Sequence, residues 1–295
     1  MKCFMLLLFP TMKTQLNKIL SVVPLLLLIF SFTASASQEI SVANTPEKKV
    51  SEFFKNSNYT FENTTDTNFQ KSEADYSASN TTAFGFEHAF GKTTAGLQLE
   101  ANKDLVGLRE FVINDSLLYA TRELFQLHDR IVFSGSTSLL IPTSEESRNV
   151  LGLRAGVTIT PSVKINFGGI GLKYVSLKLS TGFTKYFYNF KQNAEGKYNT
   201  NYKTKYSAAM NYAPKDWFSI AYSFVVQERE KYNKIVNNSQ YSNELMISSA
   251  LTKQFSISLG ITDEGAIYKE NGIDNNVKIF DNDTGSAYFT MSYSL

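Results

Sequence analysis

The sequence predicts an all-β protein, a transmembrane antiparallel up-and-down β-barrel of about twelve strands. Three observations predict this class. Segments of about ten residues alternate large apolar side chains with small or polar ones, as strands with one apolar face do. Tight turns alternate with long polar loops, and the chain starts with an export signal and stops on a bare hydrophobic residue. Barrels of ten or fourteen strands are the alternatives, because single-chain bacterial barrels have even strand numbers.

Residues 1–36 have the features of a cleaved signal peptide. Lys13 and Lys18 form a basic region, the apolar run ILSVVPLLLLIFSF overlaps its end, and residues 34–36 make an A-x-A cleavage site. A membrane anchor is the alternative, but the run is shorter than the roughly 20 apolar residues that span a bilayer. We therefore expect export, with cleavage after Ala36 or, alternatively, one or two residues later.

Loss of this segment changes the charge of the chain. The signal carries three lysines and no acidic residue, so its removal takes the formal net charge from +2 to −1. The remaining charge gives no indication of nucleic-acid binding. The only cysteine, Cys3, leaves as well, so the exported chain has no disulfide. Either Met1 or Met12 fits as the start of translation.

Residues 37–76 are rich in Asn, Thr, Ser and Lys, which predicts a flexible periplasmic leader. The barrel is then expected to occupy residues 77–295. The segment 163–190 is long for one strand and awkward as two. If it is one interrupted strand, the SNYTF stretch at 57–61 supplies the twelfth. The candidate strands are 77–90, 93–103, 111–122, 130–141, 150–160, 163–168, 172–190, 198–213, 217–228, 240–251, 254–262 and 285–295.

A soluble β-sandwich would also alternate apolar and polar residues, with the apolar face inside. The candidate strands are around ten residues or longer, whereas strands of globular proteins average five or six. Their second face is rich in Gly, Ser, Thr, Lys and Glu, which a water-filled lumen accepts. Aromatic residues gather near strand ends, as at membrane interfaces. These features favour the membrane barrel.

Loop lengths support the same interpretation. Residues 213–216 (APKD) and 252–254 (TKQ) form tight turns, whereas 191–199, 229–239 and 263–284 are long and polar. Outer-membrane barrels have short turns on one rim and long loops on the other. With the final strand running inward, the short turns are periplasmic and the long loops extracellular.

The segment 263–284 is also acidic. It contains DNDTG, which matches the first half of a calcium loop but lacks the later ligands and the bidentate Glu. We therefore expect a solvated surface loop here, with bridging of divalent ions to lipopolysaccharide as a minor alternative.

The last strand carries an assembly signal. Phe289, Met291, Tyr293 and Leu295 fall on one face of the strand, and small polar residues fall on the other. This ending resembles the C-terminal signal of Gram-negative outer-membrane β-barrel proteins, although that class usually ends in Phe or Trp instead of Leu. The resemblance implies recognition by the barrel-assembly machinery. It also implies residence in the outer membrane of a Gram-negative bacterium, among its lipids and lipopolysaccharide.

The sequence offers no catalytic residues, metal site or cofactor motif. Its two histidines are His88, on an apolar strand face, and His128, in the turn-like sequence LHDR. No segment clearly supplies the Ser, His and orienting amide of a lipid hydrolase, which stays a minor alternative. No H-E-x-x-H motif or Cys/His cluster occurs. We therefore expect a protein that is not an enzyme.

The function is then expected to reside in the lumen. Bases outnumber acids on the middle strands, which favours a small-solute channel or porin-like transporter with a preference for anions. The residues that we expect to set this preference are Arg154, Lys164, Lys178, Lys203 and Lys205. Alternatively, opposite charges pair across the interior and the barrel is a non-conducting structural or surface-interaction protein. The sequence predicts no oligomeric state.

Overall fold

A computed structural model describes residues 56–69, 76–107, 109–234, 239–269, 274–280 and 284–295. The predicted signal peptide lies outside these residues. Within them no helix is long and apolar enough to cross a membrane. The strands are β1 (Ser57–Asn68), β2 (Ala78–Phe90), β3 (Thr93–Asp104), β4 (Phe111–Ile113), β5 (Ser116–Leu127), β6 (Ile131–Ile141), β7 (Leu153–Asn166), β8 (Val175–Tyr188), β9 (Thr200–Lys215), β10 (Phe218–Lys231), β11 (Gln240–Ala250), β12 (Phe255–Ala266) and β13 (Gly285–Ser294). Short helical turns are η1 (His128–Arg130), η2 (Glu146–Val150) and η3 (Phe167–Ile170).

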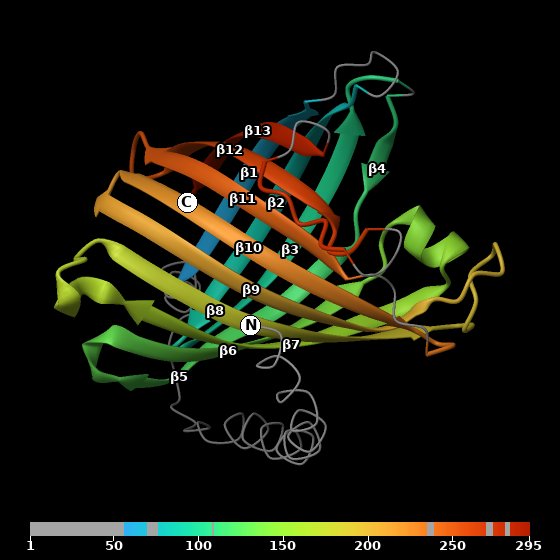
Figure 1. The fold of residues 1–295 in the computed structure, drawn as a ribbon, viewed down its shortest axis with the longest axis horizontal. Coiled ribbons are helices and arrows are strands. Elements are labelled where there is room, and N and C mark those ends of the chain that lie inside the picture. The colour runs from blue at the N-terminus through green and yellow to red at the C-terminus, as the bar shows by residue number, and fades with distance from the viewer. Residues whose placement is uncertain (1–55, 70–75, 108, 235–238, 270–273, 281–283) are drawn as a thin grey trace, which may run out of the picture. The chain divides into compact units, whose positions relative to one another are not determined.

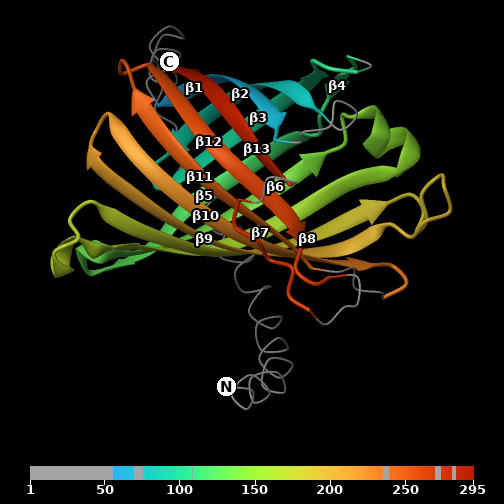
Figure 2. The ribbon, with the colours of Figure 1, turned by 45° about the horizontal axis from the view of Figure 1, so that its top comes forward.

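Twelve of the strands form a closed antiparallel ring. Each pairs with its neighbours in the chain, β1 pairs with β13, and β3 pairs with both β2 and β5. The short β4 pairs only with β3 and stands outside the ring. Figures 1 and 2 show the resulting barrel, with tilted strands and β13 beside β1. This closed ring of twelve strands confirms the predicted fold class and strand number. Closure leaves no unpaired strand edge in the ring, as a sheet in lipid requires.

The first strand corrects the predicted boundary at residue 77. Residues 57–68 form β1, so they belong to the barrel and not to a flexible leader. The polar residues that suggested a leader hydrogen-bond one another along β1 and β2. Asn63 Nδ2 donates to Asn80 Oδ1 and Thr82 Oγ1, both at 3.0 Å. Mutual hydrogen bonds let this strand be polar on its outward face. Residues 37–55 and 70–75 lie outside the described part of the chain.

The extent of β7 explains why the segment 163–190 was difficult to divide into strands. The candidates 150–160 and 163–168 are one strand, and the register between β7 and β8 is the same at Ile159 as at Ser162. Pro161 lies between them and cannot donate to the ladder, which is why the sequence suggested a break. With β7 counted once, β1 supplies the twelfth strand, as the alternative proposed for the SNYTF stretch. The segment 163–190 is not one interrupted strand, however, because it contains the end of β7 and the whole of β8.

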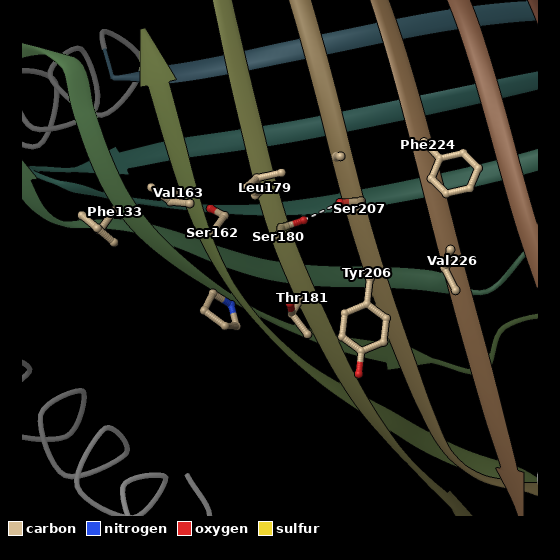
Figure 3. Close-up of a pocket in the computed structure, with 12 residues that line it drawn as sticks. Phe133, Ser162, Val163, Leu179, Ser180, Thr181, Tyr206, Ser207, Phe224 and Val226 are labelled. Atoms are coloured by element: carbon tan, nitrogen blue, oxygen red, sulfur yellow. Dashed lines mark hydrogen bonds between the residues drawn. The ribbon is translucent and has the colours of Figure 1, made fainter. Parts of the chain in front are cut away.

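Side chains alternate between an apolar outward face and a polar lumen face, and the register keeps each set together around the ring. Leu97 pairs with Leu118, Leu139 with Val157, and Leu259 with Phe289. Figure 3 shows part of the outward face over β7–β10, where an open concavity of about 600 Å³ is lined by residues such as Leu179, Tyr206 and Phe224.

The alternation in VLGLRAGVTI (150–159) predicts that Leu153 points outward together with Val157 and Ile159, but Leu153 is an exception. A bulge between Leu153 and Ala155 changes the phase of β7, and Leu153 is only 7% exposed.

The two rims differ as predicted. Short connections at 91–92, 128–130, 216–217 and 251–254 lie on one rim, together with the longer connection 167–174 and both ends of the barrel chain. The longer 105–115, 142–152, 189–199 and 267–284 lie on the other. We call these the short-turn rim and the long-loop rim.

Two described residues between β12 and β13, Lys278 and Thr284, contact outward-facing residues of β11 and β12. The Lys278 backbone N–H donates to the Tyr241 hydroxyl (3.0 Å), the Asn243 amide donates to the Lys278 carbonyl (3.3 Å), and the Thr284 hydroxyl donates to Asp263. Asn243 and Asp263 are each 1% exposed. Asp263 is therefore a buried strand residue and not part of a solvated loop, which corrects the prediction at this position.

The last residue joins the two ends of the barrel. Leu295 N–H donates to the Tyr59 carbonyl (3.0 Å), and Tyr59 N–H donates to the Leu295 carbonyl (3.2 Å). We expect Leu295→Asp to reduce the amount of assembled barrel without affecting export, because it places a charge at the end of the apolar face of β13. Heat-dependent mobility in gel electrophoresis measures the assembled fraction. Ser294→Asp, on the lumen face, is the control, and equal amounts of assembled barrel in both variants would contradict an assembly role for Leu295.

Candidate functional site

Five bases lie on the lumen face of four neighbouring strands. They alternate with outward residues such as Val163 and Leu179, so their side chains point into the barrel. We call them the basic wall. Its members are Lys164 on β7, Lys178 on β8, Lys203 and Lys205 on β9, and Arg229 on β10.

The register places like charges side by side in the basic wall. Lys164 is directly opposite Lys178, and Lys203 is directly opposite Arg229. Like charges at such positions destabilise a sheet. Lys178 and Lys205 are separated by four residues along the strands, since Gly182 pairs with Lys205. At 3.3 Å per residue this spacing is about 13 Å. The bases therefore form two levels, one toward each rim.

The facing strands carry acids. In the ring of twelve, β1 stands six positions from β8, and β2 stands six positions from β9, so these strands lie on opposite sides of the lumen. We call the acidic side the acidic wall. Its lumen-facing residues are Glu62 and Asp66 on β1, Glu87 on β2, and Glu100 and Asp104 on β3. Three further acids face the lumen from the strands between the two walls, namely Glu123 on β5, Glu264 on β12, and Glu244 on β11 beside the basic wall. A solute in the lumen thus lies between walls of opposite sign.

The two walls do not neutralise each other by contact. Among the described residues, the one ion pair within 4.0 Å joins Lys197 to Glu195 (2.8 Å) in the exposed loop between β8 and β9. Lys164, Lys178 and Lys205 are exposed. The contacts of the described residues therefore give no support to the alternative in which lumen charges pair across the interior. Unpaired bases raise the local concentration of anions around them.

Neutral donors hold the acids instead. The Tyr119 hydroxyl donates to Glu87 (2.6 Å), and the Tyr288 hydroxyl donates to Glu244 (2.5 Å). Each tyrosine ring lies over a glycine of the neighbouring strand: a Cβ on Gly96 would lie 2.6 Å from Tyr119 Cζ, and one on Gly260 would overlap the Tyr288 ring. The glycines leave room for the two tyrosine rings, whose hydroxyls hold the carboxylates in place.

Of the predicted lumen residues, Arg154 lies apart from the others. It follows the bulge at the long-loop rim, where its Nε donates to Asn189 Oδ1. Arg229 was missed, because the sequence placed the end of its strand at residue 228. Extending the alternation of Val225 and Gln227 by one step would have found it, since β10 continues to Lys231.

The histidines stand where the sequence placed them. His128 lies in η1, with a positive φ of 53°. His88 lies on the outward face at the short-turn rim, 8% exposed, and contacts the Ser57 hydroxyl at 2.9 Å and the Phe90 ring at 4.3 Å between centroids. No three His, Cys, Asp or Glu side chains cluster as metal ligands in the described part of the chain.

Comparison with known proteins gives structural matches only. No protein-family profile and no curated protein matches the chain. An outer membrane channel from Pseudomonas putida F1 superposes with a TM-score of 0.58 at 12% identity, over 81% of this chain and 95% of that one. The NanC porin superposes with a TM-score of 0.52 at 9% identity, over 80% and 98%. The chain has the fold of outer-membrane channels. At these identities the similarity extends to the fold alone, so the charged walls of this barrel carry the functional argument.

Proposed function

We propose that the protein is an outer-membrane channel for small anionic solutes. The observation that carries this proposal is the basic wall, where like charges stand opposite each other on adjacent strands without an acidic partner. Such an arrangement costs stability and is favourable only when anions neutralise it. Lys164, Lys178, Lys203, Lys205 and Arg229 would line the path, while Arg154 would act only at the mouth.

The surroundings of the proposed channel follow from the fold. The apolar outward face would contact outer-membrane lipids, and the long loops would face lipopolysaccharide outside the cell. The barrel-assembly machinery would bind the face of β13 that carries Phe289, Met291, Tyr293 and Leu295. The proposal includes no catalytic step, because the Ser57–His88 contact lies on the outward face, away from the lumen.

Recording in planar lipid bilayers tests the proposal. Purified barrel should give discrete conductance steps, and a potassium chloride gradient should give a reversal potential of the sign expected for chloride. A barrel that inserts and gives no steps would support the alternative of a non-conducting structural protein. Steps with a preference for potassium would contradict the role of the basic wall.

A further inference from the structure

A recess opens in the lumen wall beside Lys203 and Lys205, the bases toward the long-loop rim. It has a volume of about 280 Å³ and lies over β7, β8 and β9. Five hydroxyl side chains, two lysines and a glycine line it.

Gly182 creates the recess. It pairs directly with Lys205 on β9, and its missing side chain leaves the space between Thr160 and Lys205. A Cβ at this position would lie 3.3 Å from Thr160 Oγ1 and 3.7 Å from Lys205 Cβ. Its φ is not in the left-handed region, so the glycine is not required by backbone conformation. A small residue is therefore needed here for space and not for a turn.

The lining suits an anion with several oxygen atoms. Lys203 and Lys205 lie two residues apart on the same face of β9, and each ammonium offers three donors. Arg229 stands opposite Lys203 and adds a third positive charge. The hydroxyls are held in pairs: Thr158 with Thr184 at 2.8 Å, and Ser180 with Ser207 at 2.6 Å. In each pair one hydroxyl donates to the other, and the accepting hydroxyl keeps its own proton for a solute. The recess can therefore bind both oxyanion and hydroxyl groups of one solute.

We propose that this recess is a saturable binding site for small oxyanions, namely the carboxylate or phosphate group of a solute in transit. Its volume is at the lower end of ligand pockets, so the ligand is a small organic anion or phosphate itself and not a polymer. This inference rests on the proposed anion channel and adds a discrete site to it. A charged wall alone raises the local concentration of anions, and this effect does not saturate. A recess of fixed size binds a limited number of anions, so its occupancy saturates.

Two measurements separate the site from the channel. Isothermal titration calorimetry of the detergent-solubilised barrel, with sodium gluconate in one arm and inorganic phosphate in the other, reports binding without conduction. Saturable heat in either arm is expected and shows whether the carboxylate or the phosphate is preferred. Absence of saturable heat in both arms would overturn the inference, even if the barrel conducts chloride.

Variants then locate the site. Gly182→Val fills the recess without changing charge and should weaken binding at least tenfold in the calorimetric titration. Ala83→Val adds similar bulk on the acidic wall, where Ala83 pairs with Glu100, and should bind as the wild type does. Thr184→Val keeps the shape of the side chain and removes one hydroxyl, so it should also weaken binding. It replaces Gly182→Val as the test if that variant fails to assemble. If an assembled Gly182→Val barrel binds the anion as the wild type does, the site does not lie in this recess. The same result for Thr184→Val leads to the same conclusion when that variant is the one tested.

Discussion

Replacing Lys203 and Lys205 with glutamate is expected to change an anion-preferring channel into a cation-preferring one. Both residues point into the lumen from β9, and Arg229 stands opposite Lys203. A unit charge about 4 Å from a passing ion contributes roughly 1 kcal/mol in water, or about a fivefold change in local ion concentration. The double change alters the charge by four units, so the reversal potential in a salt gradient should change sign.

A matched lysine outside the lumen provides the control. Lys197 lies in the loop between β8 and β9, is 73% exposed, and is already paired with Glu195. Lys197→Glu makes the same chemical change and should leave the reversal potential near the wild-type value. Unchanged selectivity in the double variant, or an equal shift in the control, would show that the basic wall does not set the preference.

The sequence predicted the barrel well because alternation is a strong signal where one face meets lipid. It failed where that signal is absent. β1 alternates weakly, since Asn63, Asn80 and Thr82 satisfy one another by hydrogen bonds on the outward face. The predicted outward orientation of Leu153 was wrong, because the pattern of apolar residues does not reveal a bulge.

The candidate site was predicted in part. Four of its bases were identified from alternation alone, but the spatial relation between them depends on register. Neither the opposition of Lys164 to Lys178 nor that of Lys203 to Arg229 can be read from a single strand. The same holds for the acidic wall, whose position opposite the basic wall follows from the number of strands in the ring. The closure of the ring, and not the composition of any one strand, places the acidic wall across the lumen from the basic wall.

The largest effect on stability is expected from a charge on the lipid face. Leu259 lies near the middle of β12, is 59% exposed, and pairs with Ile247 and Phe289 on the outward face. Leu259→Arg should destabilise the barrel by roughly 2–4 kcal/mol, because an arginine near the bilayer midplane loses its hydration. Urea titration of the barrel refolded in lipid vesicles, followed by tryptophan fluorescence from Trp217, measures this change.

The adjacent residue tests the phase of the strand. Ser258 precedes Leu259 and points into the lumen, where its hydroxyl lies 2.8 Å from that of Ser248. Ser258→Arg places the same side chain in water, so it should cost the barrel only one neutral hydrogen bond and some crowding, about 1 kcal/mol. Since the two positions share a strand and a depth in the membrane, the difference between the variants isolates the face. Equal destabilisation would mean that the lumen is dry at this level, and a larger loss from Ser258→Arg would reverse the assignment of the two faces.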